Sequence, residues 1–204
     1  MHYAISHHNN EFPYLAVQPR KRSLKHVLLR VNQGLALLKL GKIEYAIEDG
    51  QTVWLPFDAL VGLTFFPNTR AQRVEVSCRV TEPLPKQGGY VELTPLGSAI
   101  VDRLGEEQQS QQAEKKLLSV LLDELINMEP ELSQSTLTVN IQKWSPSKND
   151  NTLSAEQHIT LTLREATKRI QSGVKKSQVI NDLFEGNEQV YKQLEQTILG
   201  HSKE

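Results

Sequence analysis

The sequence lacks the features that mark secreted or membrane-spanning proteins. Its single cysteine, Cys78, excludes an internal disulfide, and its place on the apolar side of a predicted strand indicates a buried thiol. No apolar run approaches the ~20 residues needed to cross a bilayer. Residues 1–11 contain three histidines and no apolar core, unlike a signal peptide. We therefore expect a cytoplasmic protein with no membrane partner.

The chain also has no large excess of positive or negative charge. The chain has 23 lysines and arginines against 24 aspartates and glutamates, which gives a net charge of −1. No overall basic field therefore attracts nucleic acid or an anionic membrane.

The chain also lacks the motifs that carry most enzymatic chemistry. It has no glycine-rich phosphate loop and no nucleophile motif. His26 is the only histidine in residues 26–80, whereas a metal needs about three or four ligands at once. His7 and His8 lie in a polar stretch, where adjacent histidines are expected to be solvated. We expect no metal, no cofactor and no enzymatic activity.

Short strands with alternating apolar residues fill residues 26–80. Ile43, Tyr45 and Ile47 alternate with other residues and lead into Asp49-Gly50, a strong hairpin signal. A second alternating run ends at residue 80, and glycine and proline turns divide the segment into strands of about six residues. Repeated turns with one apolar face predict a small β-barrel or sandwich.

Residues 1–25 read as a polar, irregular arm. It carries an apolar patch from Phe12 to Leu15 and a basic cluster, Arg20-Lys21-Arg22. Such an arm either folds over the mouth of the barrel or is mobile.

Two helices are predicted after the barrel. Thr94-Pro95 begins the first, which ends at Gly105. The second spans about 106–128 and carries an apolar stripe wide enough for two surfaces, so it either packs only in the core or also pairs with a second subunit. The residues of this predicted dimer interface are Leu118, Leu121, Leu125 and Met128.

The pattern becomes helical towards the C-terminus. Alternation at residues 136–141 predicts a short strand, and residues 145–151 resemble a linker. Thr162 to Glu165 is interpreted as a capping box for a helix that ends at Gly173. Helices over 177–184 and 188–199 follow, and this arrangement is typical of a helix-turn-helix unit.

These segments resemble a known family. The segment from Leu28 to Val76, with Gly34, the turn ending at Gly50 and Trp54-Leu-Pro56, resembles the cupin effector domain of AraC/XylS-type bacterial transcription regulators. The tail from Leu163 to Gly173, with residues 179–200, resembles the second of that family's two helix-turn-helix units. The first unit is either missing here or collapsed into residues 137–158.

The resemblance implies an α+β fold with an N-terminal cupin-like β-barrel, packing or dimer helices, and then a small all-α helix-turn-helix domain. The expected divisions are an arm (1–25), a cupin-like effector-binding and dimerisation domain (26–130), a connector (131–153) and the helix-turn-helix-like domain (154–204). Metal-dependent cupins place histidines and a glutamate where this chain has Leu38 to Lys42, which again argues against a metal.

The resemblance also implies a ligand-responsive transcription regulator that is a homodimer and binds a small organic effector and double-stranded DNA. The residues expected to line the effector site are Arg30, Tyr45, Trp54, Phe57 and Phe65. Cations for the DNA backbone and side chains for the bases are expected at Lys168, Arg169, Lys175, Lys176, Asn187, Gln189, Lys192 and Gln193.

Charge supports an alternative. Residues 156–204 contain seven lysines and arginines and seven aspartates and glutamates, so this domain is neutral, whereas phosphate contacts dominate affinity for DNA. The alternative is a regulatory interaction protein that kept the barrel, lost DNA binding and acts by pairing with another regulator.

Overall fold

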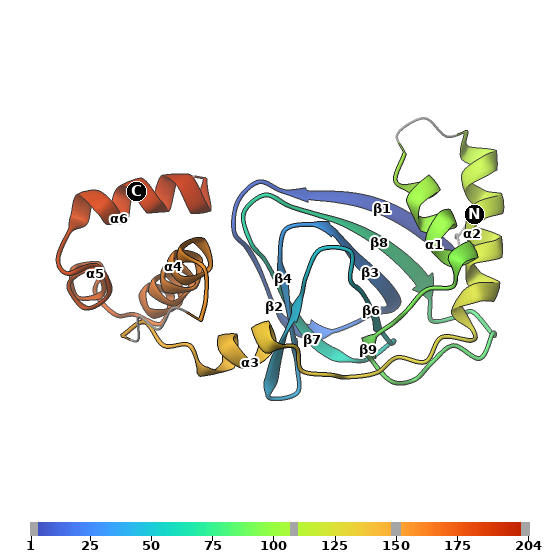
Figure 1. Ribbon diagram of the computed structural model, residues 1–204, viewed down its shortest axis with the longest axis horizontal. Helices are drawn as coiled ribbons and strands as arrows, with labels where there is room; N and C mark the ends of the chain where they lie inside the picture. Colours follow the sequence, from blue (N-terminus) through green and yellow to red (C-terminus); the bar gives the residue numbers. More distant parts are fainter. Residues whose placement is uncertain (1–3, 107–109, 148–151, 201–204) are drawn as a thin grey trace.

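The structure, a computed structural model, describes residues 4–106, 110–147 and 152–200. Its fold is α+β, as predicted: strands form the N-terminal half and helices follow (Figure 1). The five-stranded sheet has the order β1(Ile5–Phe12), β8(Thr69–Ser77), β3(Lys25–Gln33), β6(Thr52–Leu55), β9(Gly89–Tyr90). The four-stranded sheet has the order β2(Ala16–Arg22), β7(Leu60–Phe65), β4(Ala36–Leu40), β5(Ile43–Ile47).

The two sheets enclose the core of the barrel. Every strand pair is antiparallel, so alternate residues face inward. Val27 and Leu29 of β3 pack inside with Leu63 and Phe65 of β7, whereas Leu28 faces the other way. The inward set removes apolar surface from water, and this burial is the main stabilising term for the barrel.

A buried hydroxyl ties two turns together at one end of the barrel. The Thr69 hydroxyl donates to the carbonyl oxygens of Leu35 and Phe66 and accepts from the backbone N–H of Leu35. Gly34 lies against Thr69 at φ +91°, where a Cβ atom would come within 2.8 Å of the threonine oxygen. This close approach explains the glycine at this turn.

The N-terminal segment corrects the expectation of an irregular arm. β1 pairs with β8 over its whole length, and β2 pairs with β7, so residues 5–22 add one edge strand to each sheet. The strongly polar composition of these strands suits edge strands, whose outer side faces water.

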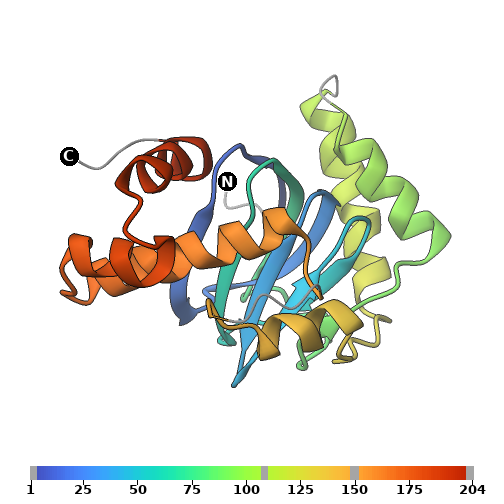
Figure 2. The ribbon, with the colours of Figure 1, turned by 60° about the vertical axis from the view of Figure 1, so that its left-hand side comes forward.

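Two helices cover the outer face of the five-stranded sheet (Figures 1 and 2). α1(Pro95–Leu104) is capped by the Thr94 side chain, as predicted. α2(Gln111–Leu125) is capped by the Ser110 side chain and so begins later than the expected start at about residue 106. Their apolar sides pack on the outward residues of the sheet, among them Leu28, Trp54 and Val74.

Two expectations are corrected here, the dimer interface on α2 and the buried thiol of Cys78. Leu118, Leu121, Leu125 and Met128 are all buried in this intramolecular core, so these four side chains are not available to a second subunit. Ala113 and the half-exposed Val120 are the apolar residues among the exposed positions of α2. Cys78 follows the end of β8 and is exposed, because the strand ends one residue before it.

The outer face of the four-stranded sheet is covered by α3(Thr136–Lys143) and by the first half of α4(Ala155–Gln171) (Figure 2). The predicted strand at 136–141 is wrong: Ser135 caps a helix there, and the Thr138 hydroxyl accepts a hydrogen bond from the backbone N–H of Ala46. The expected linker separates α3 from α4, and its residues 148–151 lie outside the described part of the chain.

The C-terminal helices are α4, α5(Lys176–Phe184), α6(Glu188–Leu194) and the π-helical turn η1(Glu195–Leu199). The capping box lies at Ser154 and Gln157 and not at Thr162, whose hydroxyl donates to the His158 carbonyl inside α4. The predicted order of a short helix, a turn and a further helix agrees with α5 and α6. In the turn between them, the backbone of both Glu185 and Gly186 has the left-handed conformation. In the described residues, no helix has the length and apolar character to span a membrane.

Candidate functional site

A cavity of about 550 Å³ opens between the edge strands β1 and β2. These two strands belong to different sheets and do not pair with each other, so the barrel is open along this seam. The walls are apolar side chains that point between the sheets: Phe12, Val27, Leu29, Leu55, Val61, Leu63 and Phe65. A larger groove of about 980 Å³, lined by Arg30, Tyr90 and Glu131 among others, is mostly polar and has no comparable apolar floor.

Cations surround the mouth of this cavity. Lys21, Arg22, Lys25 and Arg73 line it, with Glu75 as the acidic residue among its lining. Lys25 and Arg73 both pair with Glu75, at 2.6 and 3.0 Å. Burial raises the pKa of Glu75, but the hydrogen bond from Lys25 and the charges of Arg73 and Lys25 outweigh it and hold the pKa below its usual value.

Lys21 is the cation at the mouth that has no acidic partner among the described residues. The register of β2 against β7 shifts between Gln18 and Lys21, around Pro19, and this irregularity places Lys21 in the lining. Arg22, by contrast, pairs with Asp58 at 2.7 Å. An apolar cavity with an unpaired cation at its mouth suits a molecule with an apolar body and an anionic head group.

The wall of the cavity continues into the C-terminal helices through the β1–β2 hairpin. Phe12 stacks on Phe65 inside the cavity, with ring centroids 3.8 Å apart. Three residues later, the backbone N–H of Leu15 donates to the carbonyl of Ile198 in η1 at 2.7 Å. The Leu15 side chain packs with the helical core, and the ring of Tyr14 lies against Gly200.

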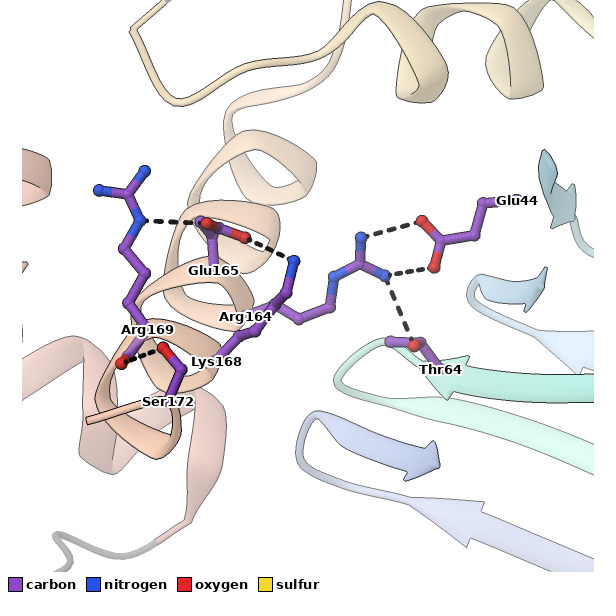
Figure 3. A network of polar contacts seen from close by, with 7 residues as sticks. All are labelled: Glu44, Thr64, Arg164, Glu165, Lys168, Arg169 and Ser172. Atoms are coloured by element: carbon purple, nitrogen blue, oxygen red, sulfur yellow. Dashed lines mark hydrogen bonds and ion pairs between the residues drawn. The ribbon is translucent and has the colours of Figure 1, made fainter. Parts of the chain in front are cut away.

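A second contact joins α4 to the barrel (Figure 3). The Arg164 guanidinium donates to both carboxylate oxygens of Glu44, at 2.9 and 3.0 Å, and lies 3.5 Å from the Thr64 hydroxyl. Both charged side chains are about three-quarters buried. This bidentate geometry is the strongest form of ion pair and fixes the helix on the sheet.

The predicted effector residues are dispersed. Phe65 lines the cavity, and Tyr45 is buried in the same core and packs edge-on against Tyr90. Trp54 lies on the opposite face of the sheet, under α1 and α2, and donates to the Pro85 carbonyl. Arg30 faces outward and pairs with Asp102 at 2.8 Å, and Phe57 lies half-exposed in a turn. Strand alternation explains the dispersal, because inward and outward residues reach different faces.

The predicted phosphate-binding cations are mostly paired with acids. Lys168 and Arg169 both lie within ion-pair distance of Glu165, at 3.6 and 3.0 Å (Figure 3). Lys176 reaches the buried Glu195 and lies 4.9 Å from the centre of the Tyr191 ring. Lys175 makes no ion pair within the described residues.

The predicted base-reading residues lie along α6, with Asn187 at its N-cap. Lys192 pairs with Glu188 at 2.9 Å, and the Asn187 side chain caps the helix by accepting from the Val190 N–H. Gln189 and Gln193 are exposed and make no side-chain hydrogen bond in the part of the chain described. Internal pairing therefore neutralises most of the charge that this surface offers to DNA.

No cluster of three or more histidine, cysteine, aspartate or glutamate side chains is placed to hold a metal within the described ranges. His7 packs on the α1–α2 side of β1, and its Nε2 atom is buried without a hydrogen-bond partner. Burial, and secondarily the neighbouring His8, lowers the pKa of His7 to about 4. His7 is therefore neutral near pH 7. The expectation that it is a solvated residue of an irregular arm is wrong.

Sequence reasoning missed Phe12, Leu15, Lys21 and Arg164 as site residues. The apolar patch and the basic cluster of the N-terminal segment signal the first three. Only the pairing of this segment with β7 and β8 shows that Phe12 and Lys21 line a cavity, whereas Leu15 packs with the helical core. Arg164 and Glu44 are 120 positions apart, and no local pattern indicates their contact.

Comparisons add similar folds. No protein-family model matches the sequence, and no curated protein is significantly similar to it. An apo variant of ToxT from Vibrio cholerae, an AraC-family regulator, aligns with a TM-score of 0.46 and 8% identity over 98% of this chain and 95% of that one. ToxT from the same organism bound to (E)-4-(8-methylnaphthalen-1-yl)but-3-enoic acid aligns with a TM-score of 0.38 and 9% identity, over 96% and 95%.

A cupin-superfamily protein from Desulfitobacterium hafniense aligns with a TM-score of 0.35 and 8% identity over 38% of this chain and 71% of that one. The two ToxT alignments cover nearly the whole of this chain, and the cupin alignment covers 38% of it.

Proposed function

We propose that the chain is a ligand-responsive transcription regulator whose barrel cavity binds a small organic anion. The observation that carries this proposal is the shared β1–β2 hairpin. One side of it lines the cavity through Phe12, and its tip bonds to η1 through Leu15. A ligand that moves Phe12 therefore acts on the position of the C-terminal helices.

The chemistry of the cavity supports an amphiphilic carboxylate as the ligand class. Its volume lies within the roughly 300–1,000 Å³ typical of small-molecule pockets. The apolar walls favour an alkyl or aromatic body, and Lys21 offers an unpaired cation at the mouth. A neutral analogue of the same shape fills the walls but leaves Lys21 without a partner.

Calorimetric titration with decanoate and with decanol tests the ligand class. We expect decanoate to bind more tightly, and Lys21→Met to weaken decanoate about tenfold, because a charge-assisted hydrogen bond contributes about 1.5 kcal/mol or more. The same substitution leaves decanol unchanged. Lys42→Met, a loss of charge outside the cavity lining, is the matched control. Equal binding of both probes, or of neither, contradicts the proposal.

A second candidate function is favoured by the paired cations of the helical domain. Lys168, Arg169, Lys176 and Lys192 each have an acidic partner, so contact with a DNA phosphate replaces an existing ion pair. On this alternative the protein keeps the ligand-responsive barrel and acts by pairing with another regulator instead of by reading DNA.

Fluorescence anisotropy on duplex DNA separates the two candidates. The regulator predicts weak binding at low salt that changes when decanoate is added. Absence of binding at the lowest salt, with decanoate binding intact, favours the interaction protein.

A further inference from the structure

Three turns gather at one end of the barrel. Arg22 of β2 and Leu40 of β4 lie beside Leu60 and Val61 at the start of β7. The turns that follow β2 and β4 and the turn that precedes β7 therefore share this end, which we call the free end: residues 22–25, 41–42 and 56–60. The opposite end carries the β1–β2 hairpin tip that contacts η1.

Large apolar side chains are exposed at the free end. Leu24 is 81% exposed, and Phe57 and Leu60 are 45% and 40% exposed. Backbone hydrogen bonds from Ser23 to Ala59 and from Asp58 to Ser23 hold the two turns that carry them side by side. Exposed apolar residues grouped in this way usually mark an interaction surface.

Cations surround these apolar side chains. Arg22, Lys25 and Lys42 belong to the free end, and Arg79 follows β8, whose Ser77 pairs with Lys25. Asp58 is paired with Arg22, and Glu75 with Lys25. Lys42 and Arg79 make no ion pair with any residue that the structure describes. The net charge of −1 for the chain thus conceals a local excess of positive charge.

We propose that the free end is a peripheral docking surface for an anionic lipid bilayer. Apolar side chains that project beyond a ring of cations match the two layers of such a surface, since the former enter the acyl boundary and the latter meet the head groups. A nucleic acid offers phosphates but no apolar phase that takes up a side chain as exposed as Leu24. Charge and exposure together therefore favour lipid.

The mouth of the cavity lies on the same surface. Arg22, Ser23, Leu24 and Lys25 belong both to the free end and to the cavity lining. The docked barrel thus opens towards the bilayer. Docking itself does not depend on the proposed ligand, and the two are separated by the double variant at Lys42 and Arg79, neither of which lines the cavity.

Co-sedimentation of the full chain with vesicles tests the docking surface. The vesicles contain phosphatidylcholine alone or phosphatidylcholine mixed with phosphatidylglycerol. We expect binding only to the mixed vesicles, weakening as salt is raised. A bimane fluorophore on Cys78, the single cysteine and exposed beside the free end, should shift to the blue on binding.

Two double variants with matched controls locate the surface. We expect Leu24→Asp with Phe57→Asp, and separately Lys42→Glu with Arg79→Glu, to weaken vesicle binding about tenfold or more. Leu96→Asp, at a 51% exposed leucine of α1, and Lys116→Glu with Lys143→Glu, at exposed lysines on helices, should bind as the wild type does. Unchanged circular dichroism confirms that the variants are folded.

Three results overturn the proposal: no binding to the mixed vesicles at low salt, equal losses in variants and controls, or duplex DNA binding that depends on Lys42 and Arg79 but not on Leu24. The variant with Lys42→Glu and Arg79→Glu should still bind decanoate as the wild type does, because neither residue lines the cavity. Failure of the docking surface is thereby distinguished from failure of the proposed ligand site.

Discussion

The two outer faces of the barrel are covered in different ways. On the five-stranded sheet, α1 and α2 pack through a large apolar core that includes Trp54, Leu121 and Leu125. On the four-stranded sheet, α3 and α4 pack through a smaller apolar cluster, and the bidentate pair between Arg164 and Glu44 supplies the main polar link.

This difference separates a permanent part of the fold from a part suited to movement. A large apolar interface opens only with global unfolding, since all of its area must be returned to water. A smaller interface held partly by one ion pair and one hairpin tip has a lower opening free energy. On the proposed function, the helical domain is thus the part that a ligand in the cavity would reposition.

The largest effect on stability is expected from substitutions in the core between α1, α2 and the five-stranded sheet. Leu121→Asp with Leu125→Asp places two charges in a fully buried core, and we expect a loss of about 5 kcal/mol or more in the free energy of unfolding. Urea denaturation measures it. Val120→Asp, on the exposed side of the same helix, should cost less than about 1 kcal/mol. If the double variant were a folded monomer and the wild type a dimer, the two leucines would instead belong to a dimer interface.

The next largest effect on stability is expected from loss of the ion pair that joins α4 to the four-stranded sheet. Arg164→Ala leaves the Glu44 carboxylate, which is about three-quarters buried, without its partner, and we expect about 2 kcal/mol of destabilisation. The double-mutant cycle with Glu44→Ala should recover most of that energy as coupling. Lys168→Ala, at an 80% exposed side chain, should change stability by less than about 0.5 kcal/mol. Equal losses of stability in Arg164→Ala and Lys168→Ala would contradict the role of the pair between Arg164 and Glu44.

A smaller effect concerns pH on the α1–α2 side. The pKa of His7 is about 4 in the folded chain against 6.5 for an ordinary histidine, so the unfolded chain binds the proton first. The folded state therefore loses stability as the pH falls from about 6.5 towards 4. Because His7 is partly exposed, we expect a loss of about 1–2 kcal/mol. His7→Phe should flatten this part of the pH profile in urea denaturation, and an unchanged profile would rule out His7 as its source.

The smallest effect concerns DNA. Since Lys175 is the predicted phosphate-binding cation without an acidic partner in the described residues, we expect a log–log salt slope of about −1 per protomer in fluorescence anisotropy. Lys175→Ala should abolish the slope, and Lys143→Ala should leave it unchanged. A slope of about −3 or steeper would show that the internal ion pairs give way to phosphates.

Local patterns predict most of the barrel and the helices because their signals lie within a few residues. The alternation in residues 26–80, the Thr94 cap and the turn at Gly186 all correspond to observed elements. The strand expected at 136–141 fails because Ser135 caps a helix, and a β-like alternation over six residues is too short to exclude one.

The candidate site is less predictable than the fold because long-range pairing creates it. The polar composition of residues 5–22 predicts an irregular arm. These residues contribute to the wall of a cavity only because they pair with β8 and β7. Likewise, composition shows the lysines and arginines of the helical domain but not the acids that neutralise them.

Hydrogen exchange with and without decanoate tests most directly whether the β1–β2 hairpin links the cavity to the C-terminal helices. The Leu15 amide, which donates to Ile198, reports the contact itself. We expect decanoate to change the exchange of residues 12–16 and of η1 together and to leave the exchange of α2 unchanged. A change confined to the cavity strands, with the Leu15 amide and η1 unaffected, would contradict the account.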